Sequence, residues 1–348
     1  GRQALASLTS GAGNVAVGYQ ACEAITTGAR NTALGYTALG NAELDETDNI
    51  AIGHGAMSLA MVGTDGGAEI DKNIAIGIDA MKGADFVAVN TDLKDNIAIG
   101  YNAMDGTGQI KAVKNVMIGH DAGGGTWTGA TSEENTGVGA SVFMGAMDGA
   151  TYNTAFGYNG LNALTTGDNN VAIGFGAGAA MTTNTSNVVI GKGAFATANA
   201  GENNNVVIGH LAGASIDSTV ATSNVIIGDT AGTGGAQEMK QCVVIGANAM
   251  NSTGGNAQYG SIAIGYNALT TLTTGGSAES GNIAIGYQSG STITTGARNI
   301  GLGYTSLGEL GATALTGNDN ICIGFQAGFK MVAGADRNIL IGSYAGDA

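Results

Sequence analysis

The sequence predicts an all-β protein, a parallel β-solenoid (β-roll) of about 18 coils. First, an eight-residue phrase, which reads Asn-Ile-Ala-Ile-Gly-Tyr-Gln-Ser at 282–289, recurs eighteen times at intervals of mostly 17 to 21 residues. Such a period is the signature of a solenoid. Second, β-branched residues alternate within the phrase, which is typical of a short strand. Third, 62 of the 348 residues are glycine, none is proline and 44% are hydrophobic, which excludes collagen and a disordered linker.

Positions within a coil are counted from the glycine of the phrase, which is position 0. In chain order these glycines are Gly18, Gly35, Gly53, Gly77, Gly100, Gly119, Gly139, Gly157, Gly174, Gly191, Gly209, Gly228, Gly246, Gly265, Gly286, Gly303, Gly324 and Gly342. Position −1 is apolar in every copy, and position −3 is Val, Ile or Thr. Because side chains alternate along a strand, −3 and −1 point to the same side. One strand per coil, stacked about 4.8 Å apart, predicts a parallel sheet along the solenoid.

Position −2 points to the opposite side of the strand, and it is Ala in half of the copies and never polar. A strand that is apolar on both sides is covered on both sides. One side would fill the coil, and the other, lined by these small residues, would meet a second chain. The sequence therefore predicts a homo-oligomer. Its predicted interface consists of Ala16, Ala51, Ala98, Ala172, Val207 and Ala284.

Position −4 is Asn in sixteen copies, with Cys242 and Ser261 as the exceptions. Asn tolerates the left-handed backbone region and bonds to nearby backbone, so it suits a corner. Identical side chains stacked coil on coil also form amide ladders, and we expect one here. The glycine at position 0 permits a positive φ or a close backbone approach where the strand ends.

The unbroken repeat predicts a single repetitive domain over 1–348, with the repeats covering 14–345. Longer loop insertions are expected at 60–72, 82–95 and 123–134, projecting from one side. Two aromatic residues within them, Trp127 and Phe86, are candidates for recognition, because loops on a rigid scaffold carry binding residues. The alternative for Trp127 is that it plugs its own loop. Phe86 opens an apolar run, 86–89, that is a candidate extra strand.

The charge balance is acidic, with 12 Lys and Arg against 27 Asp and Glu and a net charge of −15. Nucleic acid is not an expected partner, because phosphate binding needs clustered cations. We also expect no membrane insertion, because no apolar run reaches the roughly 18 residues of a spanning helix. Cys22, Cys242 and Cys322 lie far apart in the chain. We interpret them as buried thiols rather than as a zinc site or a disulfide framework.

The three histidines, His54, His120 and His210, all occupy position +1, where most other copies carry Tyr or Phe. We interpret +1 as a packing position; the alternative is a metal or proton site where three copies meet. No catalytic constellation emerges, so we predict that the protein is not an enzyme and binds no metal or cofactor. One enzymatic alternative is a left-handed β-helix acyltransferase of the hexapeptide type. The fragment 264–268 fits its hexapeptide, but only one hexapeptide per coil matches.

The phrase Asn-x-Ala-Ile-Gly-x-x-Ala resembles the head repeat of trimeric autotransporter adhesins, the YadA-like heads. Variants with a Thr-Thr-Gly-x-x-Asn spacer resemble repeats of bacteriophage tail fibres. The resemblance covers 14–345 and implies a left-handed β-roll in which three chains pack around a common axis, with small residues inside. The coils are longer than those of the adhesins, and the sequence shows no neck, coiled-coil stalk or membrane anchor. Both departures favour a phage fibre or another stacked surface filament.

These observations predict a structural or adhesive fibre protein, an extracellular, stiff homotrimeric rod on a phage virion (tail fibre) or a cell surface. Its variable loops would contact a host cell-surface receptor or glycan. The alternative is a secreted or surface filament whose subunits stack end to end. Few residues flank the repeats to cap a solenoid, which is expected of a segment of a longer fibre or of an end-to-end stacking unit.

Overall fold

The computed structural model describes residues 1–41, 46–58, 70–83, 92–107, 112–127, 129–218, 220–234, 238–253, 257–272, 280–308 and 314–346. Within these ranges the regular elements are β-strands, and no helix occurs. The chain divides into two compact units, Gly1–Ile173 and Gly174–Ala348. Each unit is a parallel β-solenoid, which confirms the predicted fold class. The left-handed winding of the coils and the trimer remain predictions.

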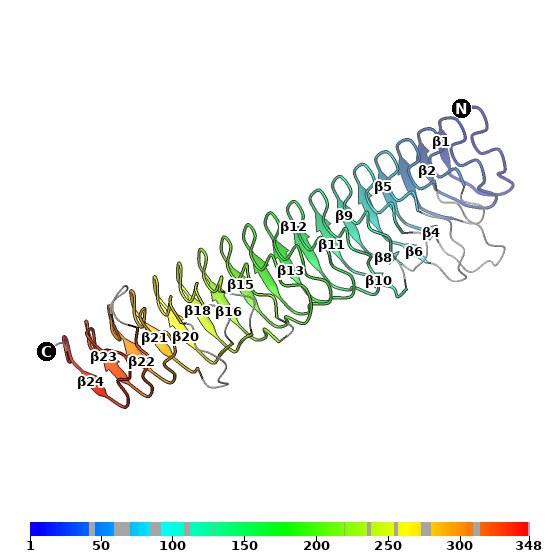
Figure 1. The fold of residues 1–348 in the computed structure, drawn as a ribbon. Helices are drawn as coiled ribbons and strands as arrows, with labels where there is room; N and C mark the ends of the chain where they lie inside the picture. The colour runs from blue at the N-terminus through cyan, green and yellow to red at the C-terminus, as the bar shows by residue number, and fades with distance from the viewer. Residues whose placement is uncertain are drawn as a thin grey trace. The chain divides into compact units, whose positions relative to one another are not determined.

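In the first unit each phrase forms one three-residue strand at positions −3 to −1, and strands of consecutive coils pair in parallel (Figure 1). The register advances by one coil at each step, so that Ala33 pairs with Ala16 on one side and with Ala51 on the other. The strands are β1 (Val15–Val17), β2 (Thr32–Leu34), β3 (Ile50–Ile52), β5 (Ile74–Ile76), β7 (Ile97–Ile99), β9 (Val116–Ile118), β11 (Thr136–Val138), β12 (Thr154–Phe156) and β13 (Val171–Ile173).

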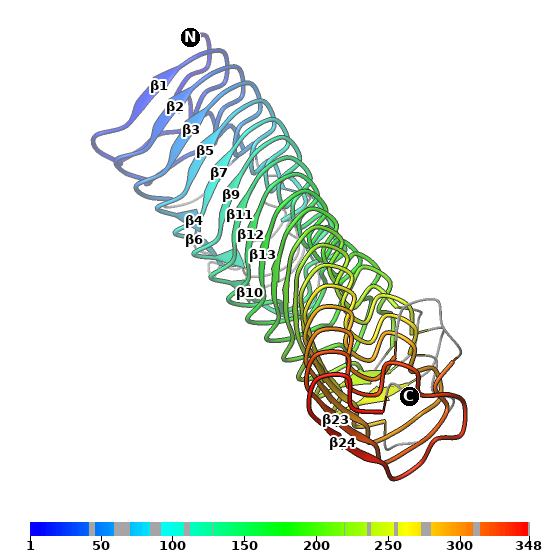
Figure 2. The ribbon, with the colours of Figure 1, turned by 90° about the vertical axis from the view of Figure 1, so that its left-hand side faces the viewer.

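A smaller parallel sheet of two-residue strands occupies another side of the same coils (Figure 2). Its strands, in spatial order, are β4 (Ile70–Asp71), β6 (Leu93–Lys94), β8 (Ala112–Val113) and β10 (Ser132–Glu133). Three of them, β4, β6 and β10, lie near the ends of the insertions expected at 60–72, 82–95 and 123–134. These insertions therefore rejoin the coil through a paired strand just before the corner that leads into the main strand.

The second unit repeats the same construction, with three-residue strands that pair in parallel from coil to coil (Figure 1). They are β14 (Val188–Ile190), β15 (Val206–Ile208), β16 (Val225–Ile227), β18 (Val243–Ile245), β20 (Ile262–Ile264), β21 (Ile283–Ile285), β22 (Ile300–Leu302), β23 (Ile321–Ile323) and β24 (Ile339–Ile341). Two short strands, β17 (Met239–Lys240) and β19 (Gln258–Tyr259), pair with each other.

Corners of the coil fall at three positions with left-handed backbone, −5, +2 and +4. In the second coil these are Arg30 (φ 59°), Thr37 (φ 51°) and Leu39 (φ 51°). The expectation that Asn at −4 forms the corner is wrong, because the residue before it takes the positive φ. Position 0 has a φ of +141° at Gly139, a region open essentially to glycine alone. A Cβ there would also overlap the carbonyl of Gly157 in the next coil.

The asparagines at −4 form the predicted ladder. Asn96 Nδ2 donates to Asn73 Oδ1 (3.1 Å) and to the carbonyl of Ala112 (2.6 Å). In turn Asn96 Oδ1 accepts from the backbone N–H (2.9 Å) and from Nδ2 (3.2 Å) of Asn115. Each amide therefore joins its own coil to both neighbours. The ladder runs from Asn14 to Asn170 in the first unit, and through Asn187, Asn205 and Asn224 and again from Asn282 to Asn338 in the second.

Candidate functional site: the outward strand face

The larger apolar side chains of the main strands point out of the coil. In β3, Ala51 has no exposed surface, whereas Ile50 and Ile52 on either side of it are half-buried. The same alternation recurs in the main strands of both units. Position −2 therefore faces the interior of the chain's own coil, and −3 and −1 face outward.

The predicted oligomer interface at −2 is consequently wrong. Five of its members, Ala51, Ala98, Ala172, Val207 and Ala284, are fully buried, and Ala16 is half-buried in the first coil. The physical reason is the narrow interior of the coil. A Cβ added to Gly137 at −2 would lie 2.8 Å from Val142 Cγ2 and 2.9 Å from Phe143 Cδ2, both across the same coil. Small residues at −2 make room for bulkier residues at +4, such as Met57, Met104 and Phe143.

The outward strand face, defined as positions −3, −1 and +1, leaves large apolar side chains in solvent. Leu34 is 47% exposed, Ile173 is 40% exposed and Ile285 is 39% exposed, all at −1. Because the strands pair in register, these side chains form continuous columns along each unit. Contiguous apolar surface of this kind marks an interaction site more often than singly exposed residues do.

Exposed aromatic rings at position +1 extend the outward strand face. Tyr266, Tyr287, Tyr304 and Phe325 stack in sequence, with centroid separations of 5.3, 4.9 and 5.4 Å. Tyr19, Tyr36 and His54 form a similar stack in the first unit. The interpretation of +1 as a packing position is correct in that the rings pack on one another, but they do so at the surface.

The histidines at +1 are exposed, and two of them contact a carboxylate. The Nδ1 atom of His120 lies 2.8 Å from Asp121 Oδ2, and that of His210 lies 2.8 Å from Asp229 Oδ1. Among the residues that the structure describes, no group of three His, Cys, Asp or Glu side chains is placed to hold a metal ion. A metal site built within one copy is therefore not indicated for the described part of the chain.

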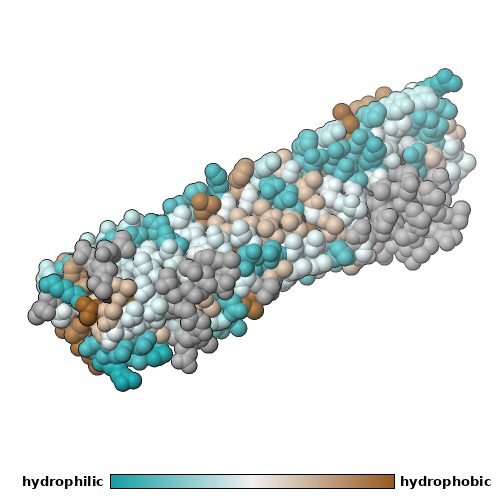
Figure 3. All heavy atoms as spheres, in the orientation of Figure 1, coloured by the Kyte–Doolittle hydropathy of each residue, from teal (hydrophilic) through white to brown (hydrophobic). Residues whose placement is uncertain are grey.

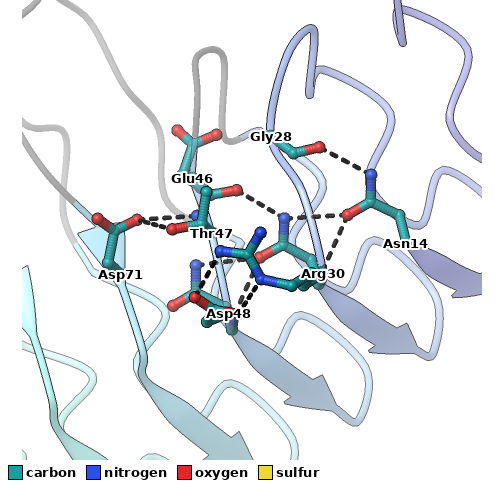
Figure 4. Close-up of polar contacts among 9 residues, drawn as sticks. Asn14, Gly28, Arg30, Glu46, Thr47, Asp48 and Asp71 are labelled. Carbon is teal, nitrogen blue, oxygen red and sulfur yellow. Dashed lines mark hydrogen bonds and ion pairs between the residues drawn. The ribbon is translucent and has the colours of Figure 1, made fainter. Parts of the chain in front are cut away.

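Charged residues at −5 border the outward strand face where the strand begins. Arg30 donates from Nε to Asp48 Oδ1 (2.6 Å) and from Nη2 to Asp48 Oδ2 (2.9 Å), and this contact holds the pKa of Asp48 below its usual range. Figure 4 shows Arg30 reaching from one coil to Asp48 in the next. Lys114 Nζ lies 3.1 Å from Glu134 Oε1 in the same way. Corner residues of adjacent coils are thus paired by charge.

On the side drawn in Figure 3, hydrophilic and near-neutral residues predominate, and strongly hydrophobic residues are scattered. This agrees with a chain in which only 11% of residues are charged. Among the described residues, no helix is long and apolar enough to cross a bilayer.

Of the two aromatic candidates for recognition, Trp127 is fully buried, and its Nε1 donates to the carbonyl of Gly123 at 2.9 Å. The structure therefore favours the alternative that Trp127 plugs its own loop, and its ring is not available at the surface. Phe86, with the candidate strand 86–89, lies outside the described residues.

The three cysteines are buried free thiols, as expected. Burial raises the pKa of Cys22 to about 12, and that of Cys242 and Cys322 to about 11. Thiols with such pKa values carry little thiolate at neutral pH and are poor nucleophiles.

Comparisons with protein-family models and with curated proteins find no match to this chain. Functional inference therefore rests on its own residues. Two features escaped the sequence argument, although the aligned copies contain them. Position +1 lies an even number of residues from −3 and −1, so by alternation it belongs to the same side of the strand. Charged residues occur at +1, at Lys192 and Asp229, and this identifies that side as the outward one. The alternation of charge at −5 is visible in the same alignment.

Proposed function

We propose that the chain is a structural, adhesive fibre protein that assembles as a homotrimeric rod on a virion or a cell surface. One observation carries the proposal: the outward strand face is apolar and half-exposed along each solenoid unit. Parallel sheets are normally covered on both faces, and here the chain itself covers only the −2 side. The apolar columns of one copy can be covered by the equivalent columns of another copy, because both have the same spacing along the stack.

The proposed arrangement places the outward strand faces of three copies around an axis parallel to the stack. Cyclic symmetry supplies each copy with two neighbours and leaves no open contact. The number three comes from the resemblance of the phrase to trimeric fibre repeats. Burying an Ile or Val side chain that is otherwise half in water contributes up to about 1–2 kcal/mol, and the columns repeat this contribution in every coil.

The mechanical role follows from how the coils are joined. Strand pairing, the Asn ladder and the tight glycine column hold each coil to its neighbours, and nearest-neighbour contacts of this kind make a stiff, extended body. The variable loops, including the insertions at 60–72, 82–95 and 123–134, are the proposed contact points for a host receptor or glycan. Three copies would compensate weak single contacts through avidity.

The proposal is tested by the mass of the native protein in solution, measured by light scattering after size exclusion. We expect three times the chain mass of 34.1 kDa. Ile285→Glu places a charge in the outward strand face and should give a folded protein of lower mass, with folding monitored by circular dichroism. Asn199→Glu, at an exposed position outside the phrase, is the matched control and should leave the mass unchanged.

A wild-type protein that is monomeric at micromolar concentration would overturn the proposal. So would an Ile285→Glu variant that keeps the wild-type mass. Ala172→Glu, which a −2 interface would call for, is unsuitable, because the buried carboxylate would disrupt the coil before it reached any partner.

A further inference from the structure

The two borders of the outward strand face carry matched charges in the first unit. At −5, six consecutive coils alternate in sign: Arg30, Asp48, Lys72, Asp95, Lys114 and Glu134. Position +2, at the other end of the same strands, is charged in only two of these coils, at Asp79 and Asp121. Both of these coils have a lysine at −5.

The remaining +2 positions avoid like charge. The coils with an acidic residue at −5, namely those of Asp48, Asp95 and Glu134, carry Gly55, Asn102 and Ser141 at +2. Within one copy the two borders do not meet, because β5 lies between Lys72 and Asp79. An extended segment of this length places them on the order of 15–20 Å apart. The match between the borders therefore has no purpose inside a single coil.

Cyclic assembly brings these borders together. When the strands of several copies form the sides of a closed ring, each strand runs in the same rotational sense, so its start adjoins the end of the neighbouring strand. Position −5 of one copy then faces +1 and +2 of the next copy at equal height. This geometry depends only on an axis parallel to the stack.

We propose that in-register assembly of this chain with further copies of itself is set by ion pairs between copies, Lys72 with Asp79 and Lys114 with Asp121. The inference rests on the proposed homotrimer. A stagger of one coil would place Asp79 against Asp48 or Asp95, and Asp121 against Asp95 or Glu134. Like charges across an interface disfavour that docking and so fix the register.

The two lysines, Lys72 and Lys114, lie at the surface, and each aspartate keeps part of its side chain in solvent, 22% for Asp79 and 28% for Asp121. Three of them already have a contact within one copy: Lys114 Nζ lies 3.1 Å from Glu134, Lys82 Nζ lies 3.4 Å from Asp79, and His120 Nδ1 lies 2.8 Å from Asp121 Oδ2. An ammonium group has three donors, so Lys114 can hold Glu134 and a partner's carboxylate together.

A zero-length carbodiimide crosslinker, which joins an amine to a carboxylate in direct contact, tests the inference on the native protein. We expect peptides that link Lys72 to Asp79 and Lys114 to Asp121. The separation within one copy forbids both links, so each reports a contact between copies. The link from Lys114 to Glu134 is the internal control, since that pair is in contact within one copy.

The mass of the same sample separates the two proposals. A trimer with the expected links supports the inference. Two results would overturn the inference and still support the trimer. In the first, Lys114 links to Glu134 but neither expected link forms; in the second, Lys72 links to Asp121. A monomer overturns the fibre proposal and this inference with it.

A second measurement uses Asp79→Lys with Asp121→Lys, and Asp79→Asn with Asp121→Asn as the neutral comparison. The lysine variant should raise the concentration for half-assembly at least about tenfold over wild type at low salt, because rim pairs contribute little singly but are repeated around the ring. Added salt should narrow the difference. Equal assembly of both variants and the wild type at low salt would overturn the inference.

Discussion

Asn96→Ala tests whether the amide ladder stabilises the stack. The substitution removes four hydrogen bonds: two that Nδ2 donates, to Asn73 Oδ1 and to the carbonyl of Ala112, and two that Oδ1 accepts from Asn115. Two of the partner groups keep another bond, because Asn73 Oδ1 still accepts the backbone N–H of residue 96 and Asn115 Nδ2 still donates to Ser132.

One buried group, the backbone N–H of Asn115, loses its partner altogether, whereas the carbonyl of Ala112 belongs to the paired strand β8. An orphaned buried polar group costs about 1–3 kcal/mol, so we expect the free energy of unfolding to fall by about 2 kcal/mol. A loss of this size is a large share of the roughly 5–15 kcal/mol that stabilises a typical domain.

The assay is urea denaturation at fixed protein concentration, together with hydrogen exchange of the Asn115 amide. We expect a lower urea midpoint and much faster exchange at Asn115. Asn199→Ala is the matched control, because the side chain of Asn199 is exposed. The reasoning is refuted if Asn96→Ala and Asn199→Ala shift the midpoint equally, or if the Asn115 amide stays protected.

Three further outcomes are expected. Cys242→Asn, where Cys242 interrupts the ladder, should raise the free energy of unfolding by about 1–2 kcal/mol through new amide bonds to Asn224 and Gln258; a lower urea midpoint would contradict this. Gly139→Ala should cost about 3 kcal/mol or more in thermal unfolding, because its φ of +141° is strained for any other residue; unchanged melting would be inconsistent with that backbone. Burial raises the pKa of Glu202 above its ordinary value. Its folded form thus favours the proton, and the stability of wild type relative to Glu202→Gln should increase as pH falls from 7 through that pKa, then level off; a melting difference independent of pH would refute it.

The sequence was sufficient to predict the repeat unit of the fold. Because the phrase recurs in register, it located the main strands, their parallel pairing and the Asn ladder at −4. These features depend on contacts between equivalent positions of neighbouring coils. Periodicity reports such contacts directly, since each residue meets its own counterpart one repeat away.

The direction of the strand faces was not predicted correctly, and the reason is physical. Alternation separates −2 from −3 and −1, but it does not say which side is inside when both are apolar. Residue size led the argument the wrong way, because small residues suit a close approach between chains. They also suit a narrow coil, and the contacts of Gly137 show that the interior leaves no room for more.

The candidate site was not located from the sequence, because the interface predicted at −2 lies inside the coil and the apolar exposed columns are at −3 and −1. Trp127 illustrates the limit, since a single aromatic residue in a Gly-rich loop can either project or fold inward. Its indole N–H donates to the carbonyl four residues earlier, and this hydrogen bond offsets the desolvation of the N–H when the ring is completely buried. A local hydrogen bond of this kind leaves no periodic trace in the sequence.

Some positions of the coil keep the same residue in nearly every copy, and others vary. The constant positions serve folding, and the variable ones are available for recognition. Position 0 is Gly in all eighteen copies and −4 is Asn in sixteen, and both columns touch the next coil. Positions −5 and +2 vary in charge, and in the first unit Lys72 and Lys114 at −5 are exposed while Asp79 and Asp121 at +2 are partly exposed. The second unit builds the same coil with Ser186, Asn204 and Ser223 at −5, so charge there is not needed to form it. Asp79→Asn with Asp121→Asn should therefore leave the melting of the coil unchanged while it loosens the register between copies.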